Sequence, residues 1–134
     1  MKLTKKDEEL IEIASNVVRY NCDIYETNNS HVACALRTKS DLVYVGMNLK
    51  SSHSVCAEQV AIGNAFAFGA REFKTIVAVQ LGNDGIPKVV APCGLCRYIF
   101  TQLKLDFNVI VPDGKQLTKV KVKDLLPFPY LRQE

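Results

Sequence analysis

Cys56-Ala57-Glu58 and Pro92-Cys93-Gly94-Leu95-Cys96 are the two stretches around which the chain is organised. Cys93 and Cys96 are three positions apart, so on a helix they share one face and can bind a single ion. Cys56 supplies a third thiol from the other stretch. Three protein ligands leave a fourth tetrahedral position for water, which is typical of a catalytic zinc site rather than a closed structural one.

The helix predicted over residues 55–68 carries a single charged side chain. Its residues are apolar almost all round, which predicts a helix that is buried on most of its sides. Between Lys50 and Arg71 the only charged residue is Glu58. Because a buried carboxylate is costly unless it has a partner or a task, Glu58 is the candidate proton carrier beside the cysteines.

Apolar periodicity predicts the elements that precede these stretches. Residues 4–20 predict an amphipathic helix that covers a sheet, with Thr4 as its N-cap. Polar residues 21–30 predict a loop over a pocket. Residues 32–36 alternate between larger side chains and two alanines, so one strand face is small enough for close packing of a helix. A short turn leads to a second strand over 42–45, which implies an antiparallel hairpin.

The second half of the chain supplies the rest of the sheet. Residues 74–81 form a continuous apolar run, typical of a strand in the middle of a parallel sheet. The further elements are a helix over 93–104, a strand over 107–111 and an edge strand around 120–122. Together they predict an α/β fold, a three-layer α/β/α sandwich with a five-stranded mixed sheet, in one domain over residues 1–134.

Composition and charge exclude several classes of protein. The net charge of +3, from 17 basic and 14 acidic residues, is too mild to indicate nucleic-acid binding. No apolar run is long enough to cross a membrane, and the N-terminus lacks the apolar core of a signal peptide. Five cysteines in such a chain favour metal or redox chemistry over a disulfide framework. We therefore expect a cytoplasmic protein with neither a nucleic-acid nor a membrane partner.

Both cysteine stretches are predicted at the starts of helices. Helix N-termini carry unpaired N–H groups and partial positive charge, so we expect them to lower the pKa of the thiols and stabilise thiolates. Arg97 is the candidate for offsetting part of the remaining negative charge. An apolar helix should raise the pKa of Glu58, which then accepts a proton from water and returns it to a leaving group. Pro92 fixes the approach of the chain to Cys93.

Two other uses of these cysteines stay open at this point. A closed structural zinc site would need a fourth ligand, for which His53 is the only nearby candidate. A thioredoxin-like redox pair at Cys93 and Cys96 would leave Cys56 and Glu58 without a role.

The paired cysteine motifs resemble those of a known family. Cys56-Ala57-Glu58 with Pro92-Cys93-Gly94-Leu95-Cys96-Arg97 is similar to the small homotetrameric cytidine deaminases and their blasticidin-S deaminase relatives, and the layout is a signature of zinc deaminases. The likeness covers most of the chain, with weaker matches at residues 32–36, 46–48 and 125–127. It implies a homotetramer, with a dimer as the alternative.

The resemblance implies a role for each matching residue. The three cysteines would hold one Zn²⁺ per subunit, and Glu58 would be the proton shuttle. The main chain at Ala57 and around Pro92 would hold a pyrimidine ring, and Asn48 would contact the sugar of the substrate.

Some residues depart from the nucleoside-specific members of that family. Asn48-Leu49-Lys50 replaces an Asn-x-Glu whose carboxylate binds a ribose hydroxyl, and the following loop is shorter. Together with Tyr130 in the tail, these features resemble the blasticidin-S deaminase branch, whose substrate has a carboxylated sugar. We therefore expect Lys50 to favour an anionic or non-ribose group. Gln59 stands where many members have an arginine that offsets thiolate charge, for which Arg97 is the expected compensation.

The expected function is hydrolytic deamination by a zinc enzyme. The 4-amino group of a free cytosine nucleoside or analogue (cytidine, deoxycytidine or blasticidin S) would become a carbonyl with release of ammonia, so the partner is a small molecule. Two alternatives stay open: deamination of another amino-substituted heterocycle on the same scaffold, and a non-catalytic zinc-stabilised binding protein.

Overall fold

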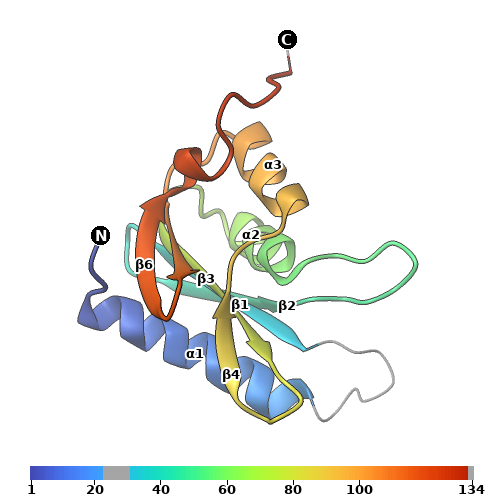
Figure 1. The fold of residues 1–134 in the computed structure, drawn as a ribbon. Coiled ribbons are helices and arrows are strands. Elements are labelled where there is room, and N and C mark those ends of the chain that lie inside the picture. Colours follow the sequence, from blue (N-terminus) through green and yellow to red (C-terminus); the bar gives the residue numbers. More distant parts are fainter. Residues whose placement is uncertain (23–30, 133–134) are drawn as a thin grey trace.

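A mixed sheet separates helix α1 on one face from helices α2 and α3 on the other in the computed structural model (Figure 1). This arrangement is the predicted three-layer α/β/α sandwich. The structure describes residues 1–22 and 31–132, so most of the loop predicted over 21–30 lies outside the described residues. The elements in chain order are α1 (Lys5–Asn21), β1 (Val32–Thr38), β2 (Val43–Met47), α2 (Ala57–Ala67), β3 (Phe73–Leu81), β4 (Pro87–Val90), α3 (Gly94–Gln102), β5 (Asn108–Asp113), β6 (Gln116–Lys121) and the 3-10 helix η2 (Val122–Leu125).

The sheet has the predicted mixture of pairings around a central apolar strand. Its order is β2-β1-β3-β5-β6, with β4 also paired to β3. The β3–β5 pair is parallel, and the other pairs are antiparallel, including the predicted β1–β2 hairpin. β6 ends at Lys121 because Val122 begins η2, so the edge strand predicted around 120–122 stops one residue earlier.

The prediction of five strands was wrong, because β4 makes the sheet six-stranded. β4 is only four residues long and begins with Pro87, which has no N–H to donate to a ladder, so its own sequence is a weak strand signal. β4 forms because it pairs with β3, where Val90 lies opposite Ala78.

The pairings of β3 also bring two distant segments together. Val32 of β1 lies opposite Gln80 on the other side of β3. The chain therefore reaches the second cysteine stretch close to the start of β1.

Alternation along β1 assigns its side chains to two cores. Ala33 and Ala35 belong to the core beneath α1, with Leu10, Ala14 and Val18 of that helix. This packing confirms that the small strand face receives a helix. Side chains at the intervening positions, Cys34 and Leu36, belong to the core beneath α2 and α3.

A close backbone approach fixes α2 against the sheet. A Cβ placed on Gly46 of β2 would lie 2.5 Å from the Ala61 nitrogen and 2.9 Å from the Val60 carbonyl carbon. Because both neighbours are backbone atoms, only glycine allows this separation of β2 and α2. The start of α2, and with it Cys56, is thereby held at a defined height over the sheet. Within the described residues, no helix is long and apolar enough to cross a lipid bilayer.

Candidate metal centre and active site

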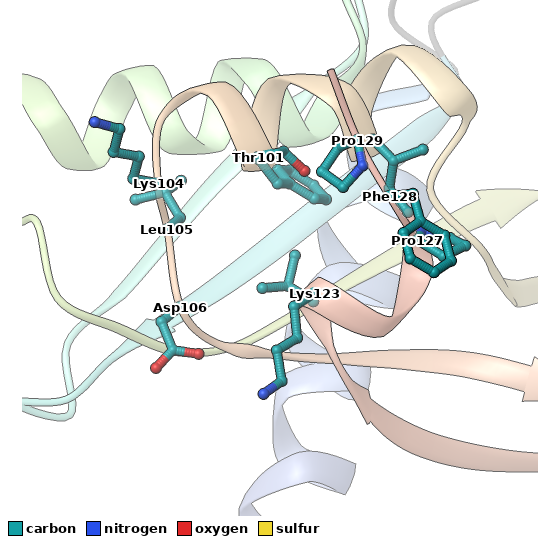
Figure 2. Close-up of a pocket in the computed structure, with 11 residues that line it drawn as sticks. Thr101, Lys104, Leu105, Asp106, Lys123, Pro127, Phe128 and Pro129 are labelled. Carbon is teal, nitrogen blue, oxygen red and sulfur yellow. The ribbon is translucent and has the colours of Figure 1, made fainter. Parts of the chain in front are cut away.

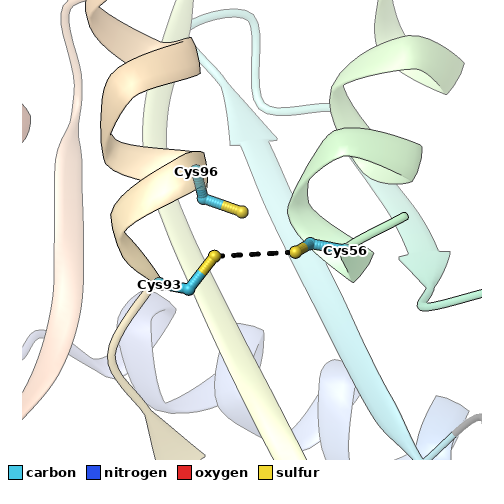
Figure 3. A group of neighbouring side chains, drawn as sticks. All are labelled: Cys56, Cys93 and Cys96. Carbon is cyan, nitrogen blue, oxygen red and sulfur yellow. Dashed lines mark hydrogen bonds between the residues drawn. The ribbon is translucent and has the colours of Figure 1, made fainter. Parts of the chain in front are cut away.

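The three cysteines lie at the N-terminal ends of two helices on the same face of the sheet. Cys56 is the N-cap of α2 and Cys93 is the N-cap of α3, and both have an extended backbone. Neither caps its helix with its side chain, so both thiols are available for other partners. Cys96 lies in the first turn of α3 and is fully buried. Figure 3 shows that the three side chains point toward one another.

The spacing of the sulfur atoms fits one tetrahedral metal ion. The Sγ atoms of Cys56 and Cys93 are 3.6 Å apart, and all three Sγ atoms lie within 4.8 Å of one another. Tetrahedral thiolates at the usual zinc–sulfur distance of about 2.3 Å would be roughly 3.8 Å apart. Three thiol donors in this arrangement suit zinc, and a fourth position stays open for a small ligand.

Burial affects the three thiols differently. Partial burial raises the pKa of Cys93, but hydrogen bonds from backbone N–H groups at the start of α3 and from the neighbouring Cys56 and Cys96 thiols outweigh it and leave the pKa below its usual value. Burial raises the pKa of Cys56, and burial together with the charge of Glu58 raises that of Cys96 well above its usual range. The prediction that helix N-termini lower all three values was therefore wrong for Cys56 and Cys96. Three thiolates can coexist here only with a cation between them.

Gln59 and Arg97, the two residues considered for charge compensation, have different contacts near the cluster. The Gln59 side-chain Nε2 lies 3.8 Å from the Cys96 Sγ, so a neutral amide contacts the sulfur. Arg97 Nε donates to the Pro92 carbonyl at 2.9 Å, and its Nη1 donates to the Leu125 carbonyl at 3.3 Å. The direct contacts of Arg97 are thus to backbone oxygens that hold the approach to Cys93, and its charge compensation stays a prediction.

A pocket of about 210 Å³ opens beside the cysteines and contains the lone carboxylate of α2. Glu58 is only 6% exposed, and its side chain has no partner from another residue in the described part of the chain. Burial raises the pKa of Glu58. A buried carboxyl group without a partner is costly to fold, which is typical of a functional position. The lining residues are Val32, Asn48, Ser54, Val55, Cys56, Ala57, Glu58, Val90, Ala91 and Cys93.

Two of the five residues predicted to bind substrate line this pocket. Asn48 and Ala57 do so, whereas Lys50, Pro92 and Tyr130 do not. The Asn48 Oδ1 accepts from the Val32 backbone N–H at 2.9 Å, which leaves its NH₂ group as the available donor.

The pocket also has lining residues that sequence reasoning missed. They are small or apolar side chains from separate elements, namely Val32, Ser54, Val55, Val90 and Ala91. Ser54, Val55, Val90 and Ala91 lie directly before the two cysteine stretches, which was the available signal. Val32 instead opens β1, and its approach to the other lining residues depends on the β1–β3–β4 pairing.

The alternative metal and redox sites do not match the geometry. His53 lies in the exposed loop over residues 50–54 beside Ser52, and the potential metal group found among the described residues contains only the three cysteines. A closed site that uses His53 is therefore not formed. A redox pair of Cys93 and Cys96 would not account for the Cys56 sulfur at 3.6 Å from that of Cys93.

The fold and the site together define a class of protein: an α/β/α sandwich with an open three-thiol zinc site beside a buried acid. The family model of the cytidine and deoxycytidylate deaminase zinc-binding region matches residues 4–111. The chain therefore belongs to the cytidine and deoxycytidylate deaminase family, whose members bind zinc in this region.

Known relatives are similar to this protein over almost the whole chain. The blasticidin-S deaminase of Bacillus cereus is 33% identical over 137 residues, which cover 97% of this chain and 96% of that protein. A probable cytidine deaminase of Dictyostelium discoideum is 29% identical, over 95% of this chain and 85% of that protein. The crystal structure of cytidine deaminase from Burkholderia pseudomallei is similar with a TM-score of 0.70 and 28% identity, over 96% of this chain and all of that one.

We expect purified protein to contain one zinc ion per chain, and Cys96→Ser to lose most of it. A hydroxyl is a poor zinc ligand, and the two remaining thiols cannot complete the site. Cys22→Ser is the matched control, since Cys22 lies outside the cluster. Elemental analysis after dialysis measures the zinc content. Equal zinc content in both variants would contradict the assignment of the ligands.

Proposed function

We propose that the chain is a zinc-dependent hydrolase that removes the 4-amino group of a free cytosine nucleoside, or of a close analogue such as blasticidin S, with release of ammonia. The observation that carries this proposal is the position of Glu58. Its buried, unpaired carboxyl group shares one pocket with Cys56 and Cys93, so a proton carrier stands beside the open metal position.

The pocket walls suit a flat, partly polar ring. Val32, Val90 and Ala91 supply small apolar surface. Ala57 is the first residue of α2, so its N–H has no acceptor within the helix and is free to donate to a ring carbonyl oxygen. The NH₂ group of Asn48, whose Oδ1 is held by Val32, would donate to a hydroxyl group of the attached sugar.

The chain's own residues account for the proton transfers. A zinc ion held by the three cysteines would supply Lewis acidity and an activated water at its open position. Glu58 would accept one proton from the attacking water and deliver it to the amino group, which leaves as ammonia. Since burial favours the neutral form of Glu58, the carboxyl group can hold this proton between the two steps. The second proton of the water ends on the adjacent ring nitrogen as the ring carbon becomes a carbonyl. One water is consumed for each ammonia released.

We expect Glu58→Gln to lose deaminase activity by about a hundredfold or more while it retains zinc, because an amide cannot carry the proton. Its thermal stability should be unchanged or higher, since the substitution removes a buried ionisable group. Ammonia release from cytidine, deoxycytidine and blasticidin S measures activity, and elemental analysis measures zinc.

The exposed Glu72→Gln is the control and should match the parent protein. If Glu58→Gln kept full turnover, the role of Glu58 would be refuted. If the parent protein bound these compounds without releasing ammonia, a binding protein would replace the enzyme. If the protein released ammonia only from other amino-substituted heterocycles, the substrate would be one of those compounds and not a cytosine nucleoside.

Lys50 is proposed to favour a substrate with an anionic group on its sugar. It lies in the exposed loop over residues 50–54, which a pair of backbone hydrogen bonds between Leu49 and Val55 closes, and it does not line the pocket. Its cation is two residues from Asn48, so it can act on the outer part of a substrate whose ring occupies the pocket. The likeness to a blasticidin-S deaminase supports this choice.

We expect Lys50→Glu to lower the rate on blasticidin S relative to that on cytidine by about fivefold, as reversal of an exposed charge allows. Steady-state kinetics with both substrates measure the ratio. Lys115→Glu, in the exposed β5–β6 turn, controls for the change in net charge. An unchanged ratio in Lys50→Glu would rule out this role.

We propose a homotetramer, the assembly that the family resemblance implies, and the apolar surface around α3 and the tail supports burial between chains. Pro127, Phe128 and Pro129 line a cavity, whose residues Figure 2 draws. The volume of the cavity is about 430 Å³. The Phe128 side chain is fully exposed, and Tyr130 is 74% exposed. Apolar side chains this exposed are typical of surfaces that are covered by another chain. The substrate contact that the resemblance implies for Tyr130 would require such an assembly, because Tyr130 does not line the pocket of its own chain.

We expect zinc-loaded protein to sediment at about four times the 14.9 kDa of one chain. Phe128→Ser should shift the species toward smaller assemblies, because it removes apolar contact area from the interface. Sedimentation velocity measures both. A parent protein that sediments as a monomer at micromolar concentration would refute the tetramer.

A further inference from the structure

A polar cavity lies far from the cysteine site, beneath the start of α1. Its volume is about 280 Å³. Val32 of β1 lines the cysteine pocket, whereas Arg37 lines this cavity five residues further along the same strand, or roughly 17 Å away. The two sites also lie on opposite faces of the sheet, since Arg37 follows the alternation of Ala33 and Ala35 under α1. The lining residues are Thr4, Lys5, Lys6, Asp7, Arg37, Lys74, Thr75 and Lys119.

Cations exceed acids in the lining of this cavity. Five of its eight lining residues are lysine or arginine. The single lining carboxylate, Asp7, is already paired with Lys119 at 2.7 Å. Outside the lining, Asp41 contacts Lys6 at 2.8 Å and Arg37 at 3.0 Å. The remaining lysines, Lys5 and Lys74, form none of the ion pairs found in the described part of the chain.

A buried hydroxyl group in this cavity has no partner. Thr75 is only 2% exposed, and its side chain makes no hydrogen bond within residues 1–22 and 31–132. A buried hydroxyl group without a hydrogen bond costs free energy, and in folded proteins nearly all such groups have a protein, water or ligand partner. The side chain of Arg37 is also buried, yet its hydrogen bonds to Asp41 and to the Lys6 carbonyl leave further N–H donors. The cavity therefore presents donors that are short of acceptors.

The first turn of α1 adds backbone donors at the same place. Thr4 and Asp7 form a capping box, in which the Thr4 N–H bonds to the Asp7 carboxylate and the Asp7 N–H bonds to the Thr4 hydroxyl. The N–H groups of Lys5 and Lys6 are the next in the turn, and no helical acceptor precedes them. They lie at the positive end of a helix of 17 residues.

We propose that this cavity binds a phosphate group, as the free ion or as a phosphate monoester. A phosphate has several strong acceptor oxygens and at least one negative charge, which match the free lysines, the remaining Arg37 donors and the Thr75 hydroxyl. The volume is about nine times the share of one liquid water, so a five-atom oxyanion fits with part of its hydration. Binding would link α1, β1, β3 and β6, each of which contributes to the lining.

Thermal unfolding of zinc-loaded protein tests the proposal with two probes, inorganic phosphate and ribose 5-phosphate, each at fixed ionic strength against chloride. A ligand that binds only the folded state raises the melting temperature. We expect at least one probe to do so. Lys74→Gln and Thr75→Val should each lose most of this rise, and the affinity measured by calorimetry should fall by about fivefold in Lys74→Gln.

Lys121→Gln is the matched control, because Lys121 is an exposed lysine of β6 outside the cavity, and it should keep the full rise. A rise with phosphate identifies the free ion as sufficient, and a rise with ribose 5-phosphate alone identifies a monoester as the ligand. No rise with either probe would overturn the proposal. A rise that persists in Lys74→Gln and Thr75→Val would also overturn it, since the anion would then bind elsewhere, including the open metal position.

Discussion

The meeting of two helix N-termini over one face of the sheet is the constraint on which the site depends. Sulfur atoms from α2 and α3 can approach to 3.6 Å only if both helices are held at a fixed height and angle. Gly46 sets the height of α2 through backbone contact with β2. β4 fixes the start of α3, because it pairs with β3 up to Val90, three residues before Cys93. The metal site is thus a product of sheet pairing as much as of the cysteines themselves.

The apolar residues of α2 determine the properties of its buried carboxyl group. Glu58 lies on a helix whose other buried residues are alanine and isoleucine, so nothing on α2 neutralises it. That environment raises its pKa and makes the ionised group a poor contributor to stability, which agrees with the proton transfer proposed for it. The same low polarity raises the pKa of Cys96, which makes the folded site dependent on a cation. Zinc binding and the proposed proton transfer by Glu58 therefore depend on the same low polarity.

Local patterns in the sequence were sufficient for most of the fold. Helical spacing, the Thr4 cap and the two alanines of β1 act within one element, and each correctly predicted its structure. β4 could not be predicted, because its strand character comes from β3 rather than from its own four residues. Helix starts are also local features, so the cysteines were correctly placed there. Val32 and Val90, which also line the pocket, were missed. Their meeting depends on register across β3, which no local pattern records.

Charge is segregated between the two ends of the sheet, although the composition gives only a mild net charge of +3. Six polar or charged residues are buried among those described, and Asp7, Arg37 and Thr75 line the cavity under α1, whereas Glu58 lies in the cysteine pocket. The cysteine end gathers groups that become negative and needs a cation. The other end gathers lysines and arginine with few acids. The sheet and its two apolar cores lie between these ends and keep the two groups of charges apart.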